Sequence, residues 1–365
     1  MKTAPHLLVC ISAHGYGHVA QVAPILNLLR TKLPQLRISL RTTVPVSHLR
    51  NRIAGKFQYI EQASDFGMCM ASAMEVKVEE SFNAYADFHA DWDARVAQEA
   101  EALALLTPDL VLSDVAYLPL AASACLGIPS IAMCSLNWAD IFRHYCSAFP
   151  GAEAIQLQIE QAYAGADAFL HLTPGMPMFW LNNLLPMGPV AGVGMNRRQQ
   201  INELLNLKNK EKLVLVSMGG ITTRLPMDNW PQMLGIRWLV QNDWQVKRQD
   251  VSTIESLAMD FMDVLASCDA ILSKPGYGAF AEAACNAIPM IYVERDGWPE
   301  QGDLVAWLEQ HGHCLKLDMQ QMQTGDFAAE LQYFLALPKP VPVVPSGIEQ
   351  VTEFLLERLA QGTSD

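Results

Sequence analysis

Two histidines flank a glycine turn near the start of the chain, in the run Ala13-His14-Gly15-Tyr16-Gly17-His18. A second polar group, Asp114, directly follows the apolar run Leu110–Ser113. Imidazole can take a proton from a hydroxyl near neutral pH, and a carboxylate beside it orients the ring and stabilises its charged form. His18 and Asp114 therefore predict a general base that acts on a hydroxyl group. The structural alternatives are a capping or core histidine and an aspartate at a helix N-cap.

Two glycine-rich loops further along the chain predict a site for an anion. Ser217-Met218-Gly219-Gly220 follows an apolar run, and Lys274-Pro275-Gly276-Tyr277-Gly278 leads into a helical pattern. Glycines allow a ligand to approach the backbone closely, and the free N–H groups of a turn or a helix start can hold a phosphate. Lys274 adds a positive charge. These loops therefore predict a ligand that carries phosphate groups.

Acidic side chains after the second loop suit the hydroxyl groups of a sugar. Glu282 lies four residues beyond Gly278 and hence on the same face of the predicted helix. A carboxylate beside a phosphate would be repelled, so its natural partners are ribose hydroxyls slightly further out. Glu300 and Gln301 follow the apolar run Met290–Val293 and together can accept and donate hydrogen bonds to sugar hydroxyls. The alternatives are an exposed helix charge for Glu282 and a solvated loop for the other two.

The elements around these residues predict a parallel sheet. An apolar strand over 6–12, a helix over 19–31 and a second strand over 37–43 form the opening of a βαβ unit. In doubly wound sheets, ligands bind beyond the carboxyl ends of the strands. The chemical groups described above come after predicted strands, so we expect them to gather at one edge.

An internal repeat indicates two similar α/β halves. The segment that begins at Asp109 resembles the segment that begins at Asp269, 160 positions later, and each predicts strand, loop, helix, turn and strand. We therefore expect an α/β protein with two similar halves. The first domain is expected over 1–195 and the second over 196–345, with a terminal helix within 346–365 that packs back on the first.

Composition excludes several classes of protein. The 365 residues carry a net charge of −13, which argues against a nucleic-acid partner because such proteins need an excess of lysine and arginine. The eight cysteines form no CxxC pair, so reduced thiols are expected. The best candidate for a membrane span, 115–139, is interrupted by prolines and a glycine. No integral membrane segment is predicted, and the expected location is cytoplasmic.

Five motifs in a fixed order resemble the GT-B family of nucleotide-sugar glycosyltransferases, especially its MurG-type and UDP-glycosyltransferase branches. They are HGYGH after the first strand, SD at 113–114, SMGG at 217–220, KPGYGAFAEA at 274–283 and PEQ at 299–301. The likeness to the glycosyltransferase-like N-terminal region of the plant L-arabinokinases is closer still, and it covers roughly residues 6–335. Where the plant enzymes have a His-Cys signature, this chain has Lys274-Pro275.

The resemblance implies an α/β protein of GT-B type with two Rossmann-like domains that face a cleft, and it implies a role for each loop. On the acceptor side it implies a base, its orienting partner and a supporting loop, which are His18, Asp114 and the group His14, Gly15 and Gly17. On the donor side, the diphosphate would be held by Gly219, Gly220, Lys274, Gly276, Tyr277 and Gly278, the ribose by Glu282, and the sugar by Glu300 and Gln301. The family works without a catalytic metal and needs no further cofactor, so helix N-termini and side chains such as Lys274 must stabilise the leaving diphosphate.

These observations predict an inverting glycosyl transfer from a nucleotide diphosphate sugar, expected to be a UDP-sugar, to an acceptor hydroxyl that His18 deprotonates. A nucleotide-sugar epimerase or hydrolase on the same fold remains an alternative, as does a non-catalytic sugar-nucleotide binding protein. An NADP-dependent oxidoreductase rests only on the GxGxxA pattern over Gly15–Ala20, because no acidic residue ends the second strand. The sequence does not identify the acceptor.

Overall fold

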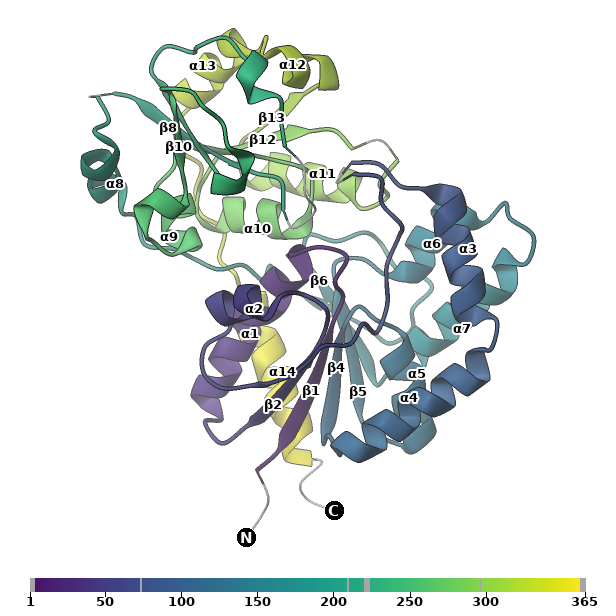
Figure 1. Cartoon of the computed structure of the whole chain (residues 1–365). Helices are drawn as coiled ribbons and strands as arrows, with labels where there is room; N and C mark the ends of the chain where they lie inside the picture. The colour runs from purple at the N-terminus through teal and green to yellow at the C-terminus, as the bar shows by residue number, and fades with distance from the viewer. Residues whose placement is uncertain (1–3, 73, 209, 220–223, 296, 362–365) are drawn as a thin grey trace.

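Two parallel β-sheets, each covered by helices, organise the chain (Figure 1). The structure is a computed structural model that describes residues 4–72, 74–208, 210–219, 224–295 and 297–361. Within these residues the first sheet has seven strands in the order β3-β2-β1-β4-β5-β6-β7, and the second has six in the order β10-β9-β8-β11-β12-β13. The neighbouring strands in both sheets are parallel, as the βαβ pattern of the sequence predicted.

The first sheet and its helices extend from residue 6 to residue 187. The strands are β1 (His6–Ile11), β2 (Arg37–Arg41), β3 (Gln58–Ile60), β4 (Leu110–Asp114), β5 (Ser130–Cys134), β6 (Ala168–Leu172) and β7 (Leu184–Met187). The helices are α1 (Gly17–Lys32), α2 (Val46–Arg52), α3 (Val78–His89), α4 (Trp92–Leu106), α5 (Leu118–Leu126), α6 (Trp138–Cys146) and α7 (Ala152–Ala164).

The central strand β1 is apolar from Leu7 to Ile11 because helices cover both of its faces. Leu7 and Val9 belong to the apolar cluster that includes α1, whereas Leu8 and Cys10 belong to the cluster that includes α4. Neighbouring side chains of a strand point to opposite faces, so a strand with helices on both sides needs apolar residues throughout. The polar residues of this region are therefore left to the loops at the strand ends.

The second sheet and its helices follow from residue 198 onward. The strands are β8 (Lys212–Ser217), β9 (Ile236–Val240), β10 (Val251–Thr253), β11 (Ala270–Ser273), β12 (Met290–Val293) and β13 (Cys314–Leu317). The α-helices are α8 (Arg198–Leu205), α9 (Phe261–Ala266), α10 (Tyr277–Cys285), α11 (Gln301–His311), α12 (Met319–Thr324) and α13 (Ala328–Ala336). Short 3-10 helices lie at η1 (Met227–Asn229), η2 (Asn242–Trp244) and η3 (Glu255–Leu257).

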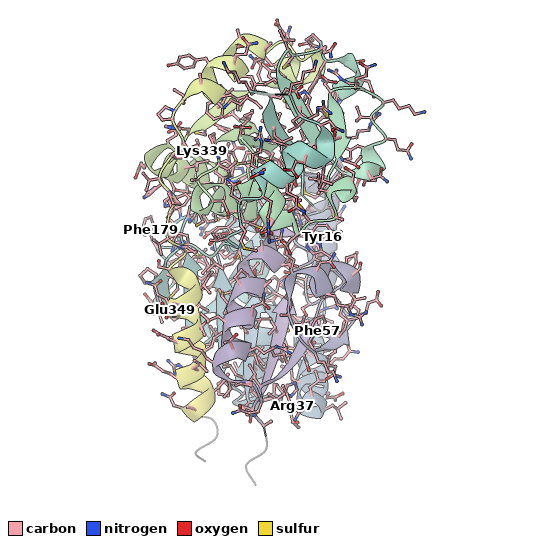
Figure 2. All side chains as sticks on the ribbon, turned by 90° about the vertical axis from the view of Figure 1, so that its left-hand side faces the viewer. Tyr16, Arg37, Phe57, Phe179, Lys339 and Glu349 are labelled. Atoms are coloured by element: carbon pink, nitrogen blue, oxygen red, sulfur yellow. The ribbon has the colours of Figure 1, made fainter. Side chains whose placement is uncertain are left out.

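The last helix, α14 (Gly347–Gln361), lies beside the first sheet rather than the second (Figure 1). Val351, Leu355 and Leu359 are buried in the apolar cluster that contains α1. Lys32 at the end of α1 also lies 3.7 Å from the carboxylates of Glu349 and Glu353. The side view in Figure 2 shows Glu349 on α14 along the lower half of the molecule, and Tyr16 near the level where the two halves meet. The domain limits proposed from the sequence stay predictions.

The two halves touch where α1 and α10 begin. A side chain built on Gly278 would stand 3.2 Å from Cβ of Ala20 and 3.5 Å from Cα of Gly17, so this position has room only for glycine without a shift. The carboxyl ends of the two sheets therefore face each other across the starts of α1 and α10. None of the described helices combines the length and the apolar character required to cross a membrane.

Candidate active site

Loops from both sheets enclose a small cavity between the two halves. Its volume is about 120 Å³, and its walls include the loop before α1, the residues after β5, the loop before α10 and the segment between β12 and α11. A larger cavity of about 500 Å³ adjoins it. The two share Tyr16, Gly17, Gly219, Ser273 and Gly278 among their walls. Groups that are far apart in the sequence thus line one continuous space.

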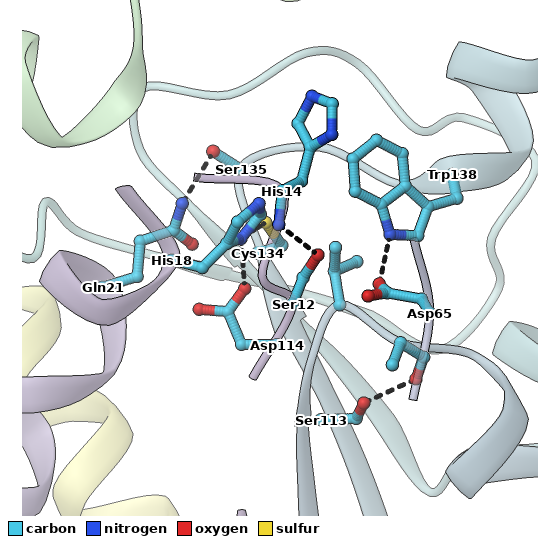
Figure 3. Close-up of polar contacts among 12 residues, drawn as sticks. Ser12, His14, His18, Gln21, Asp65, Ser113, Asp114, Cys134, Ser135 and Trp138 are labelled. Carbon is cyan, nitrogen blue, oxygen red and sulfur yellow. Dashed lines mark hydrogen bonds and ion pairs between the residues drawn. The ribbon is translucent and has the colours of Figure 1, made fainter. Parts of the chain in front are cut away.

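His18 and Asp114 form a buried pair at the edge of the first sheet (Figure 3). Nδ1 of His18, in the first turn of α1, lies 2.8 Å from Oδ1 of Asp114, the last residue of β4. Asp114 is 0% exposed, and its Oδ2 has no described partner. Burial alone would lower the pKa of His18, but the Asp114 carboxylate, with smaller contributions from Asp65 and Glu300, raises it above 6.5. The pair has the geometry of a carboxylate-oriented imidazole.

The second ring nitrogen of His18, Nε2, determines the chemistry that this pair can support. The carboxylate of Asp114 accepts the hydrogen bond, so the proton of neutral His18 belongs on Nδ1 and the lone pair on Nε2. No described residue hydrogen-bonds to Nε2, and His18 lines the 120 Å³ cavity. A hydroxyl bound there could pass its proton to Nε2. The N-cap alternative for Asp114 is wrong, because α5 begins at Leu118 with Tyr117 at its N-cap.

Cys134 gives the same cluster a third potential metal ligand. Ligand atoms of His18, Asp114 and Cys134 lie within 4.8 Å of one another. A metal would need the thiolate, yet burial raises the pKa of the Cys134 thiol well above its ordinary value, and the nearby Asp114 carboxylate adds to this effect. Nδ1 of His18 is also already bonded to Asp114. We therefore interpret the three side chains as a hydrogen-bonding group.

His14 stands in an aromatic wall beside this pair. Its ring lies at 5.2 Å, edge-on, from Trp138 and is stacked at 5.7 Å on Trp298. Its Nε2 is buried without a partner, and burial together with nearby positive charges, including His18, lowers its pKa well below 6.5. The neighbouring glycine Gly67 has φ +64°, and a side chain there would come within 2.6 Å of the His14 ring. His14 is thus a neutral, tightly enclosed part of the wall.

A buried carboxylate lies behind the aromatic wall. Nε1 of Trp138 donates to Oδ2 of Asp65 at 2.7 Å (Figure 3). Oδ1 of Asp65 has no described partner, and burial raises the pKa of this group to about 6. The negative charge of Asp65 also acts on His18 and favours its protonated form. Asp65 is not among the site residues predicted from the sequence.

The loop before α10 brings Lys274 and its glycines to the opposite wall. Lys274 Cε lies 3.4 Å from the point that a side chain of Gly219 would occupy, so the two predicted glycine loops meet here. Gly276 and Gly278 also line the 120 Å³ cavity. Burial, with the charge of Arg295, lowers the pKa of Lys274 to about 8. Lys274 has no ion-pair partner within the described parts of the chain, which suits a site for an anion.

Glu300 ties the second half to the first. Its Oε1 accepts a hydrogen bond from Ser135 Oγ at 2.6 Å, and Ser135 in turn accepts one from Gln21 at 3.2 Å. Glu300 is buried and lines the 120 Å³ cavity. Gln301 is not among the lining residues, and its Oε1 accepts the backbone N–H of Arg295 at 2.7 Å. The structure thus brings Glu300 to the cavity wall and uses the Gln301 oxygen to hold the preceding loop.

Glu282 lies in the wall of the 500 Å³ cavity rather than on the surface. It is 5% exposed, so the alternative of an exposed helix charge is wrong. Its Oε1 lies 2.7 Å from Nη1 of Arg52, at the end of α2 in the first half. Arg52 also covers the ring of Phe261 at 5.3 Å. The ion pair fixes Glu282 across the boundary between the halves.

The structure places the remaining predicted site residues as follows. Tyr277 lines the 120 Å³ cavity, but its hydroxyl accepts the N–H of Val190 at 2.8 Å and lies 3.2 Å from the carbonyl of Thr173. This hydroxyl is therefore occupied by the segment that joins the two sheets. Gly15 and Gly17 line the same cavity, and a side chain on either would meet nothing within 4 Å. Gly220 lies outside the described residues.

Comparison with known proteins identifies the fold. No family model matches the chain. L-arabinokinase of Arabidopsis thaliana is 23% identical over 359 residues, which is 96% of this chain, and the chain spans only about a third (34%) of that relative. Among solved structures, the glycosyltransferase VinC in complex with dTDP superposes with a TM-score of 0.58 at 14% identity and covers 98% of this chain and 99% of its own.

Two further solved structures agree with this assignment. The calicheamicin glycosyltransferase CalG4 has a TM-score of 0.58 at 13% identity, with 99% of this chain and 95% of its own covered. A UDP-glucosyltransferase from Polygonum tinctorium, capable of glucosylating indoxyl, has a TM-score of 0.54 at 13% identity, with 99% and 94% covered. The GT-B fold predicted from the sequence, two Rossmann-like halves that face a cleft, is confirmed.

Proposed function

We propose that this chain is a glycosyltransferase that moves a sugar from a nucleotide diphosphate sugar, a UDP-sugar in the first instance, to an acceptor hydroxyl. The observation that carries the proposal is the arrangement around the 120 Å³ cavity. On one side lies the His18–Asp114 pair, and on the other lie the glycine loops with Lys274. Among the described residues, Nε2 of His18 has no hydrogen-bond partner and Lys274 has no ion-pair partner. A proton acceptor thus faces an anion site across a space that both halves enclose.

The transfer follows from these positions. Nε2 of His18 takes the proton of the acceptor hydroxyl, and the oxygen attacks the anomeric carbon of the donor sugar. The bond from that carbon to the diphosphate oxygen breaks, and the diphosphate leaves with the electron pair. Because the acceptor and the leaving group lie on opposite sides of the sugar, the anomeric configuration inverts. Asp114 stabilises the imidazolium that forms on His18.

The departing diphosphate needs positive charge, which this chain can supply without a metal. Lys274 provides a cation, and the backbone N–H groups at the start of α10 provide the positive end of a helix. Glu282 can accept from ribose hydroxyls through the carboxylate oxygen that Arg52 leaves free. Glu300 lies beside Ser135 and suits a hydroxyl of the donor sugar. Donor binding is thus assigned to the second half and proton removal to the first.

A binding panel followed by turnover tests the proposal. Thermal unfolding is measured with UDP, GDP, UDP-sugars and NADP; a ligand at one hundred times its Kd should stabilise the chain by about 2.7 kcal/mol. We expect a nucleoside diphosphate or its sugar to stabilise it and NADP to have no effect. Stabilisation by NADP alone would contradict the proposal. Conversion of the donor in the absence of any acceptor would favour the epimerase or hydrolase alternative instead.

A further inference from the structure

Arg295 is a buried cation that the proposed reaction does not yet use. It follows β12 and is 4% exposed, and its guanidinium lies 3.7 Å above the ring of Trp298. Among the described residues, its Nη2 contacts only the sulfur of Met70, at 3.6 Å, and its buried Nε has no partner. No carboxylate among the described residues forms an ion pair with it. A guanidinium in this setting has most of its hydrogen-bonding capacity unused.

A second buried arginine in this chain has a structural role and provides a comparison. Arg41, at the end of β2, is 1% exposed and forms a hydrogen-bonded ion pair with the equally enclosed Glu99. Burying a charge without a counter-charge is unfavourable by several kcal/mol, so buried arginines are normally paired in this way. Arg295 has no such partner among the described residues, and it lines the 120 Å³ cavity. The charge of Glu300 acts on Arg295 without forming an ion pair with it, so the hydrogen-bond donors of the guanidinium remain available to a ligand.

Arg295 contacts other residues of the cavity wall than the glycine loops do, although its charge reaches Lys274 and lowers the pKa of that amine. Lys274 stands over Gly219, whereas Arg295 contacts Met70 of the first half and covers Trp298, on which His14 is stacked. Arg295 is also absent from the lining of the 500 Å³ cavity, which contains Glu282. A diphosphate at the glycine loops would therefore leave Arg295 facing the part of the substrates nearer to His14 and His18.

The geometry points to Arg295 as the binding residue for a second anionic group, a carboxylate or a phosphate, that the substrates carry in addition to the donor diphosphate. This inference rests on the proposed function and narrows its substrate class. Trp298 covers one face of the guanidinium and leaves its edge for paired hydrogen bonds, the geometry that carboxylates and phosphates accept. The group belongs either to the donor sugar, as in a uronic acid, or to the acceptor.

Isothermal titration calorimetry separates these two sources. Wild type, Arg295→Gln and the matched control Lys274→Gln are each titrated with UDP, UDP-glucose and UDP-glucuronate, and then with inorganic phosphate after saturation with UDP. If the anionic group is on the donor sugar, wild type should bind UDP-glucuronate about 10- to 100-fold more tightly than UDP-glucose. Arg295→Gln should remove that preference. If the anionic group is on the acceptor, wild type should bind the two UDP-sugars with equal affinity. UDP-saturated wild type should then bind phosphate, and Arg295→Gln should not.

The control defines what would overturn the inference. Lys274→Gln should weaken UDP and both UDP-sugars alike. If Arg295→Gln weakens UDP itself to the same extent, the guanidinium serves the diphosphate and the inference is wrong. It is equally wrong if wild type neither distinguishes the two donors nor binds phosphate. Wild type that binds no nucleoside diphosphate contradicts the proposed function instead, and phosphate titration without UDP then still tests Arg295.

A folding defect would be visible separately. Urea unfolding is recorded for each variant, and Arg295→Lys provides a second substitution that keeps the charge but loses the paired hydrogen-bond geometry. We expect Arg295→Lys to bind the anionic ligand with an affinity between those of wild type and Arg295→Gln. Affinity unchanged in both variants would contradict the inference even if their folding is intact.

Discussion

The segments β4–α5–β5 and β11–α10–β12 have the same backbone plan but opposite charges at the same place. The second copy follows the first by 160 positions, and the offset places Lys274 where the first copy has Asp114. Each leading strand also pairs with the first strand of its own half: Asp114 is in register with Ile11, and Ser273 with Ser217. Asp114 then meets His18, whereas Lys274 meets Gly219. Under the proposed function, one side chain at a strand end thus distinguishes the loop that takes the proton from the loop that binds the anion.

The largest effect is expected from removing His18, the proposed base in the first half. His18→Ala should lower turnover by about 1,000-fold or more, because general bases typically contribute two to four orders of magnitude. Binding of UDP should persist, since the glycine loops lie in the second half. Steady-state rates and calorimetric UDP titrations measure the two quantities. Loss of UDP binding with His18 would show that the two loops are not functionally separate.

A smaller effect is expected from the carboxylate behind the histidine. Asp114→Asn should lower turnover by about 100-fold, because the amide no longer stabilises the imidazolium. The base must be neutral to act, so wild-type activity falls as the pH drops through the pKa of His18, which Asp114 holds above 6.5. In Asp114→Asn this acidic limb should move to lower pH. A pH profile that keeps its limb in place would contradict the role given to Asp114.

The counterpart on the other loop is Lys274, whose effect should fall on binding. Lys274→Gln should weaken UDP by about tenfold with little change in the pH limb of turnover, because one charge-assisted hydrogen bond is lost. The Lys274 pKa of about 8 means that wild-type affinity should decline as the pH rises above 8 and the amine loses its proton. Lys274→Arg should keep its affinity over that range. UDP titrations between pH 7 and 10 compare the three proteins.

The site residues that follow strand ends could be predicted from the sequence, and the reason is geometric. His18, Asp114, Lys274 and the glycines meet because parallel strands carry their carboxyl ends to one edge of each sheet, which a βαβ pattern already predicts. The backbone plan therefore fixes their neighbourhood before any packing is known. The same logic located Glu300, since it comes shortly after β12.

Residues whose role depends on contacts between the halves could not be predicted in this way. Arg52 reaches Glu282 and Ser135 reaches Glu300 only because the two halves pack together, and neither belongs to a motif. Asp65 lies in the long connection after β3, where the sequence shows no periodicity. Arg295 had one usable signal, a basic residue beside the PEQ motif, but its burial and lack of a partner are visible only in three dimensions.

The smallest expected effect concerns the tyrosines that also share the 160-position offset. Tyr117 Oη lies 2.8 Å from Nε2 of His89, whereas Tyr277 Oη accepts the N–H of Val190 in the segment between the sheets. Tyr117→Phe removes the partner of His89 Nε2, and Tyr277→Phe removes the partner of the Val190 N–H and of the Thr173 carbonyl. Each variant should therefore lower the free energy of unfolding by about 1–2 kcal/mol. Urea unfolding measures this loss.

Although both Phe variants should lose stability, they should differ in their effect on UDP affinity. Tyr117 bonds within the first half, so Tyr117→Phe should leave UDP affinity unchanged. Tyr277 holds the connecting segment to the start of α10, so Tyr277→Phe should also weaken UDP, by about threefold or less, through looser placement of the glycine loop. Equal effects of the two variants on UDP affinity would mean that the Tyr277 hydroxyl has no role of its own in positioning the glycine loop. A loss confined to Tyr277→Phe would show that the duplicated residue positions the anion loop.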